Sequence, residues 1–108
     1  MESTDVVKAL AALAHPLRLA VFRSLVVAGS GGLTPTVMHE RIEVAPATLS
    51  FHLKELVNAG LVTQERASRN LIYRAEYRNM NRLLQYLTEN CCEGAQCSLE
   101  SRCSGCEC

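Results

Sequence analysis

The feature that most constrains the fold is a helix-length segment that leads directly into two β-like segments. Residues 45–58 carry apolar side chains at helical spacing, and Ala59-Gly60 ends the run. Residues 61–66 and 70–75 have the composition of strands and are separated by Ala67-Ser68-Arg69. The two β-like segments therefore predict an antiparallel hairpin with a basic tip.

Four other segments show helical periodicity and surround this unit. Pro16 and Pro35 each suit the first turn of a helix, where the missing N–H costs no hydrogen bond. At 108 residues, the chain has the length of one small domain. Its order is four helices, a hairpin and a last helix. The four segments are residues 3–14, residues 16–28, residues 34–42 and residues 77–89.

The fourth helix is amphipathic in a way that suggests a binding surface. Its apolar stripe predicts an inward face made of Leu49, Leu53, Leu56 and Val57. A short helix, a tight turn, a second helix and a hairpin are the parts of a winged helix-turn-helix domain, which places the second helix in the DNA major groove. The fold class is therefore mainly α with a β-hairpin wing. The predicted DNA-binding residues are Thr48, Ser50, Phe51, His52, Lys54, Arg66 and Arg69.

The alternative interpretation of that outer face is an ordinary solvated helix surface. The arginines of the predicted wing favour the DNA-binding interpretation. The 11 basic and 11 acidic residues cancel, so bulk charge identifies no partner. Because phosphate contacts supply most non-specific affinity, a neutral protein should bind DNA modestly and with salt dependence. A thiol enzyme would need a reactive cysteine in a formed pocket, so no enzymatic activity is expected.

All six cysteines lie within the last eighteen residues, beginning at Cys91. The chain has no apolar run of roughly 18 residues and no signal-like N-terminus, which predicts a cytoplasmic protein. In a reducing compartment, clustered cysteines favour metal or redox chemistry over structural disulfides. We therefore expect a domain over residues 1–90 for DNA binding and dimerisation, and a flexible cysteine-rich tail over residues 91–108 that binds an inducer.

Three segments resemble the signature segments of ArsR/SmtB-type metalloregulatory repressors. They are His15-Pro-Leu-Arg-Leu-Ala-Val-Phe-Arg-Ser-Leu25, Leu49-Ser-Phe-His-Leu-Lys-Glu-Leu-Val-Asn-Ala-Gly-Leu-Val62 and Arg69-Asn-Leu-Ile-Tyr-Arg74. The resemblance implies a homodimer joined through the first and last helices, which represses an operon until an inducer weakens its binding to operator DNA. Two common family metal sites are absent, because the third helix lacks cysteine and residues 77–89 lack His and Asp.

The tail resembles that of an arsenite-sensing subgroup, with a vicinal cysteine pair and a third cysteine soon after the last helix. Cys91, Cys92 and Cys97 match this pattern, and their soft thiolates suit trivalent arsenic (arsenite) or antimony. Cys103, Cys106 and Cys108 form a second candidate set. A zinc-, cadmium- or redox-responsive repressor and a metal-buffering protein are the alternatives. The predicted function is a metalloid-responsive transcriptional repressor.

Overall fold

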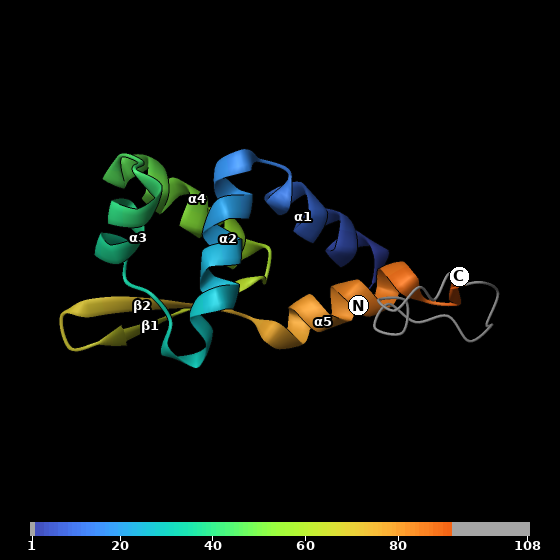
Figure 1. The fold of residues 1–108 in the computed structure, drawn as a ribbon. Helices are drawn as coiled ribbons and strands as arrows, with labels where there is room; N and C mark the ends of the chain where they lie inside the picture. Colours follow the sequence, from blue (N-terminus) through green and yellow to red (C-terminus); the bar gives the residue numbers. More distant parts are fainter. Residues whose placement is uncertain (1, 92–108) are drawn as a thin grey trace, which may run out of the picture.

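The computed structural model describes residues 2–91 and has the predicted order of elements (Figure 1). The hairpin lies at the same end of the molecule as α3 and α4, whereas α5 extends toward the opposite end beside α1. This arrangement confirms the predicted winged helix-turn-helix fold. The elements are α1 (Ser3–Leu13), α2 (Pro16–Ala28), the 3-10 helix η1 (Gly29–Gly31), α3 (Pro35–Ile42), α4 (Pro46–Asn58), β1 (Val62–Ala67), β2 (Asn70–Ala75) and α5 (Tyr77–Thr88).

Local sequence explains where three of the helices begin. Pro16, Pro35 and Pro46 each occupy the first turn of their helix, where the absent N–H removes no helical hydrogen bond. The His15 Nδ1 atom accepts a hydrogen bond from the Leu17 N–H at 3.1 Å, and the Thr34 hydroxyl accepts one from the Val37 N–H at 3.4 Å. These caps satisfy N–H groups that the first helical turn leaves without partners.

The hydrophobic core joins α4 to the helices that precede it and to the root of the hairpin. The largest fully buried side chains come from α2, α3, α4, the residue before β1 and the first residue of β1, and the buried part of α1 consists of small residues. Burying a leucine or valine stabilises the fold by roughly 1.5–3 kcal/mol, so this cluster fixes the rotation of α4 about its axis. The fully buried large residues are Val21, Leu25, Met38, Leu49, Leu53, Leu56, Leu61 and Val62.

Within residues 2–91, no single helix is long and apolar enough to cross a membrane. The α1 and α2 helices pass that test of length and composition only as a pair, and they are bent by 102° at the break between them.

The first strand is shifted by one residue from the prediction: it covers Val62–Ala67 and not residues 61–66, so Ala67 pairs with Asn70 and belongs to β1. The hairpin turn therefore contains only Ser68 and Arg69, and Ser68 has a positive φ of 62°. At the root, Leu33 and Tyr73 exchange backbone hydrogen bonds of 2.9 and 2.8 Å. The hairpin is thereby attached to the segment that connects α2 with α3.

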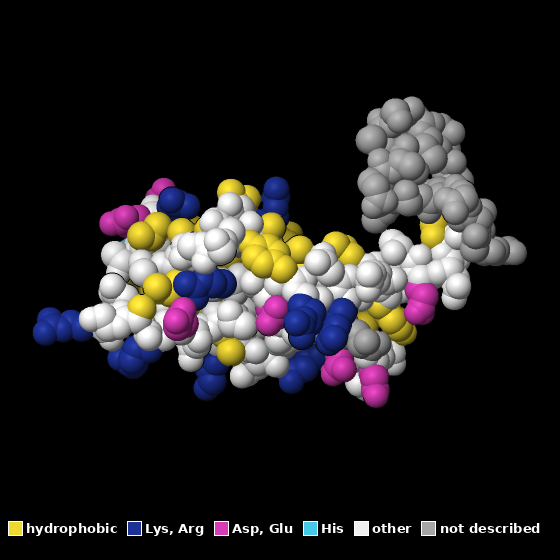
Figure 2. Space-filling view, turned by 90° about the horizontal axis from the view of Figure 1, so that it is seen from below, with side chains coloured by type: hydrophobic (Ala, Val, Ile, Leu, Met, Phe, Trp, Pro, Cys, Tyr) yellow, Lys and Arg dark blue, Asp and Glu magenta, His cyan; other side chains and the backbone are white. Residues whose placement is uncertain are grey.

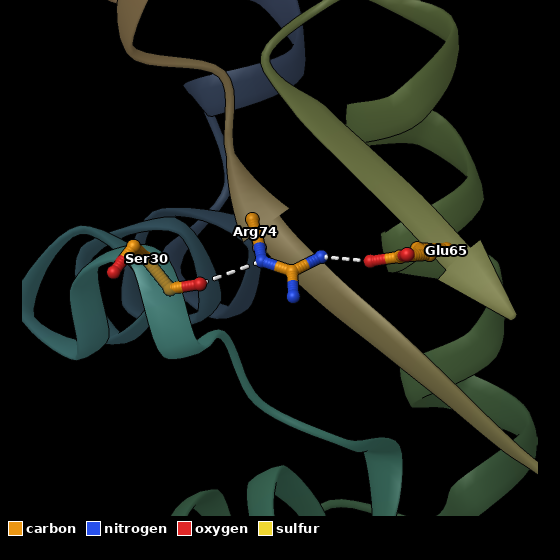
Figure 3. Close-up of polar contacts among 3 residues, drawn as sticks. All are labelled: Ser30, Glu65 and Arg74. Atoms are coloured by element: carbon orange, nitrogen blue, oxygen red, sulfur yellow. Dashed lines mark hydrogen bonds and ion pairs between the residues drawn. The ribbon is translucent and has the colours of Figure 1, made fainter. Parts of the chain in front are cut away.

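Arg74 adds a second attachment between the hairpin and η1, the 3-10 helix that follows α2 (Figure 3). Its Nε atom donates to the Ser30 carbonyl oxygen at 2.7 Å, and its Nη1 atom lies 2.6 Å from a carboxylate oxygen of Glu65. Because both charged groups are partly exposed, we assign the ion pair only about 0–1 kcal/mol of stability. Its main effect is to hold the root of the hairpin in one orientation.

At Gly32, both the backbone conformation and the close packing exclude a side chain. Its φ is 69°, and a Cβ atom there would lie 2.7 Å from both the Tyr73 carbonyl oxygen and the Ile72 Cγ2 atom. We expect Gly32→Ala to lower the free energy of unfolding by about 2 kcal/mol or more, through backbone strain and displacement of β2.

Urea denaturation of the two neighbouring alanine variants tests this expectation. Gly31→Ala is the matched control, because its Cβ would meet nothing within 4 Å and Gly31 is not at positive φ. The control should stay within about 0.5 kcal/mol of the parent protein. Equal stability of the two variants would show that the close packing at Gly32 has no energetic consequence.

Candidate nucleic-acid interface

Helix α4 presents an exposed face because its leucines are buried on the other side. Leu49, Leu53 and Leu56 are each at most 2% exposed, at the i, i+4 and i+7 spacing of one helix face. Thr48, Ser50 and Lys54 are exposed, and so is Phe51, whose side chain is 57% exposed. The outer face of α4 therefore carries one exposed aromatic ring among hydroxyl and ammonium groups.

The connection between α3 and α4 is short and has a defined conformation. Glu43 ends α3 with a left-handed backbone at φ 57°, and its N–H donates to the His39 carbonyl oxygen at 2.9 Å. The His39 ring is in hydrogen-bond contact with the Val44 carbonyl oxygen through Nδ1. These contacts set α4 in place relative to α3. Nothing in the local sequence predicts a left-handed glutamate at this position.

The hairpin supplies the positive charge of the candidate interface. Arg66 on β1 and Arg69 at the turn are exposed, and Lys and Arg side chains project at the hairpin end of the face in Figure 2. The neighbouring carboxylate of Glu65 is paired with Arg74. Arg66 and Arg69 therefore keep their charges available for a polyanion.

The structure corrects the predicted position of His52. This side chain is only 6% exposed and lies on the inward side of α4, between Leu49 and Leu56 at helical spacing. Its Nδ1 atom is 3.3 Å from Arg18 Nη1, and its ring centre is 4.5 Å from that of His15. His52 is therefore oriented toward α2, and it does not share the exposed face with Phe51.

Burial controls the protonation of His52. Loss of solvation lowers the pKa of His52 below the ordinary 6.5, electrostatic interactions with His15 and Arg18 lower the pKa further, and Glu55 opposes them. A guanidinium group has only N–H donors, so the His52 Nδ1 atom must accept the hydrogen bond from Arg18. The arrangement therefore requires a neutral imidazole with its proton on Nε2.

A separate apolar surface lies on the two terminal helices. Leu83 of α5 is buried, while its neighbours Leu84 and Leu87 remain exposed. Val7 and Leu10 of α1 are exposed as well, and α1 contacts α5. Four large apolar side chains on two adjacent helices are more than scattered surface residues, and they mark a surface that another chain can cover.

The predicted inducer site falls almost wholly beyond the part of the chain that the structure describes. Cys91 is half-buried and follows the end of α5 closely. Cys92, Cys97, Cys103, Cys106 and Cys108 lie outside the described residues. Within residues 2–91, no three His, Cys, Asp or Glu side chains lie close enough together to hold a metal ion.

Comparisons with known proteins agree with this geometry. Residues 13–65 match a family model described as a helix-turn-helix domain, which spans the end of α1 through most of β1. No curated protein matches the chain. An ArsR-like transcriptional regulator from Rhodococcus sp. RHA1 has a TM-score of 0.74 at 22% identity, covering 94% of this chain and 89% of that one.

Two other solved structures add detail. A possible transcriptional regulator for arsenical resistance has a TM-score of 0.65 at 26% identity, covering 74% of this chain and 80% of that one. The homodimeric winged helix-turn-helix DNA-binding domain of Mb0332 from Mycobacterium bovis, a possible ArsR-family regulator, has a TM-score of 0.64 at 22% identity, covering 88% of each chain. The similarity in fold therefore extends beyond the helix-turn-helix region to most of the chain.

Proposed function

We infer that this chain is an ArsR-family transcriptional regulator, and we propose that it represses transcription by binding operator DNA as a homodimer. We further propose that trivalent arsenic or antimony releases it from DNA by binding the C-terminal cysteine thiols. The observation that carries the DNA-binding part is the orientation of α4. Its buried leucines turn Thr48, Ser50, Phe51 and Lys54 outward, close in the chain to a wing that bears exposed arginines.

Each exposed group of the interface has a chemistry suited to one part of DNA. The hydroxyls of Thr48 and Ser50 can exchange hydrogen bonds with base edges in the major groove, and Phe51 can contact a thymine methyl group. Lys54 and the wing arginines Arg66 and Arg69 suit phosphates, which position the protein without reading sequence. Sequence preference should therefore come from α4 and salt-dependent affinity from the wing.

The apolar surface on α1 and α5 supports a homodimer. A second copy would cover Val7, Leu10, Leu84 and Leu87, which a monomer exposes to water. The related fold of Mb0332 is homodimeric. Two-fold symmetry would present two copies of α4 and therefore requires a palindromic operator.

The inducer proposal rests on the cysteine pattern of residues 91–108 and on the position of the first cysteines, directly after α5. Three thiols, Cys91, Cys92 and Cys97, begin directly after α5. With arsenous acid, each thiol exchanges an As–O bond for an As–S bond, and its proton leaves with the hydroxide as water. The exchange changes no oxidation state and suits a soft three-coordinate centre. Similarity to a possible regulator for arsenical resistance supports this choice of inducer.

Binding beside α5 offers a route from the inducer to the DNA. Because α5 carries part of the apolar surface, an ion held at its end can change how two subunits pack and therefore how far apart their α4 helices lie. A 100-fold loss of operator affinity requires about 2.7 kcal/mol of coupling, which lies within the usual range for allosteric proteins.

Salt dependence tests the role of the wing. We expect Arg69→Ala to weaken binding to all DNA sequences and to reduce the slope of log Kd against log salt concentration by about 2 per dimer, one phosphate contact being lost from each subunit. Fluorescence anisotropy at several salt concentrations measures the slope. Arg82→Ala, which removes an exposed arginine on α5, should leave the slope nearly unchanged. Identical slopes for both variants would show that the wing tip does not contact DNA phosphates.

A further inference from the structure

Arg18 lies where three helices meet and contacts two of them from the third. Its Nε atom donates to the Ala12 carbonyl oxygen in the last turn of α1 at 2.7 Å. Its Nη1 atom donates to the His52 Nδ1 atom of α4 at 3.3 Å. Arg18 itself belongs to the first turn of α2. One guanidinium group therefore connects the end of α1 with the middle of α4.

The chemistry of this contact depends on the planar shape of the guanidinium. Arginine presents several donors in a rigid fork, so two hydrogen bonds in different directions also fix the relative position of the two acceptors. A lysine ammonium keeps the charge on a flexible stem and lacks that fixed geometry. The apolar contacts between α1 and α4 resist separation, whereas hydrogen bonds are directional and resist sliding or rotation.

His15 supports the arrangement from the joint between α1 and α2. Its ring lies 4.5 Å from the His52 ring, tilted by 43°, and its Nδ1 atom accepts from the Leu17 N–H. Both imidazoles therefore use Nδ1 as an acceptor toward α2. The exposed Phe51 ring also contacts His52 edge to face, with the two ring centres 5.4 Å apart. The cluster thus reaches from the end of α1 to the outer face of α4.

We propose that Arg18 is a positioning residue that fixes α4 against the end of α1 through Ala12 and a neutral His52. The effect on DNA rests on the function proposed above, in which α1 contributes to the dimer and α4 enters the major groove. Arg18 then makes the direct polar link between the dimer interface and the DNA-binding helix within one subunit. Loss of the link leaves the fold intact but changes the angle between α4 and the α4 helix of the second subunit in the dimer.

Acid should break the same link. A proton on His52 Nδ1 would place an N–H opposite the Arg18 N–H donors, so the hydrogen bond is lost and two positive charges face each other. The titratable and charged groups that face the ring are His15 from the joint between α1 and α2, Arg18 from α2 and Glu55 from α4. The pKa of His52 in the folded protein lies below the unfolded value of 6.5. The stability that the neutral ring contributes is therefore fully present above pH 6.5, and it is lost as the pH falls through the folded pKa.

The test combines operator binding with NMR of the histidine rings in the full chain. We expect Arg18→Met and Arg18→Lys to weaken operator binding about 10-fold at neutral pH. Arg23→Met, which removes an exposed arginine from the same helix, should change it less than 2-fold. His52→Leu should weaken binding in the parent protein and have little further effect in the Arg18→Met background, because both changes remove one contact.

The NMR measurement is independent of DNA. Ring ¹⁵N shifts of the three histidines, assigned with His52→Asn, should show His52 with its proton on Nε2, and Arg18→Met should raise its pKa. An Nδ1–H tautomer in the parent protein would overturn the link, as would an unchanged His52 titration in Arg18→Met. Parent-like DNA affinity of Arg18→Lys would show that the fork has no positioning role. Failure of the parent protein to bind any operator would count against the proposed function alone.

Discussion

Leu87→Glu is expected to convert the protein from a dimer to a monomer and to weaken operator binding at least 100-fold. The Leu87 side chain is 54% exposed in the single chain and lies beside Leu84 on α5. In a dimer joined through α1 and α5, this position would be desolvated. A carboxylate without a partner there costs several kcal/mol. Because a monomer occupies one half-site, it also loses the gain that comes from binding two sites at once.

Sedimentation velocity and DNA titration measure the two parts of this prediction separately. Val27→Glu is the matched control, since Val27 is an even more exposed apolar residue but belongs to α2. It should remain dimeric and bind operator within 2-fold of the parent protein. A Leu87→Glu protein that is folded by circular dichroism, dimeric and fully active on DNA would show that α5 is not the subunit interface.

Cys92→Ser should strongly weaken the release of DNA by arsenite while leaving operator binding itself unchanged. A serine hydroxyl is a harder and weaker ligand than a thiolate, so trivalent arsenic would keep only two sulfur ligands from Cys91 and Cys97. We expect the arsenite concentration for half-release to rise at least 100-fold. The measurement is an anisotropy titration of a preformed complex with arsenite, repeated with antimonite, zinc and cadmium.

Cys106→Ser is the control from the second set of cysteines. It should release DNA at the same arsenite concentration as the parent protein. If Cys92→Ser responds normally and Cys106→Ser does not, the inducer site belongs to the distal cysteines. If zinc or cadmium releases the complex and arsenite does not, the regulator responds to a different soft ion. A protein that binds metal but not its own promoter DNA would be a metal-buffering protein.

The order of the elements was predictable because it depends on local patterns. Proline at the first turn of three helices, apolar periodicity and strand composition act over a few residues each, and all are visible in the sequence. The inward face of α4 was predictable for the same reason, since Leu49, Leu53 and Leu56 share one side of any regular helix. These local signals together were sufficient for the winged helix-turn-helix fold.

Long-range contacts escaped prediction because no local pattern encodes them. The contact between His52 and Arg18 joins residues that are 34 positions apart in the chain. The i, i+3, i+4 and i+7 spacing of positions 49, 52, 53 and 56 was the available signal that His52 faces inward. The close packing at Gly32 and the hydrogen bond from Arg74 to Ser30 likewise depend on how the segment after α2 lies against β2. The proposed roles of Cys92 and Cys97 still rest on sequence pattern.

The most direct test of arsenite-controlled repression uses the parent protein, a palindromic DNA fragment from its own promoter and arsenite. We expect a dimer that protects both half-sites from cleavage, binds with a steep salt dependence, and loses the protection when arsenite is added. If a competing dithiol restores the protection of the half-sites, the release by arsenite is reversible. Protection that persists at saturating arsenite, or an absence of any protected site, would show that the protein is not an arsenite-released repressor.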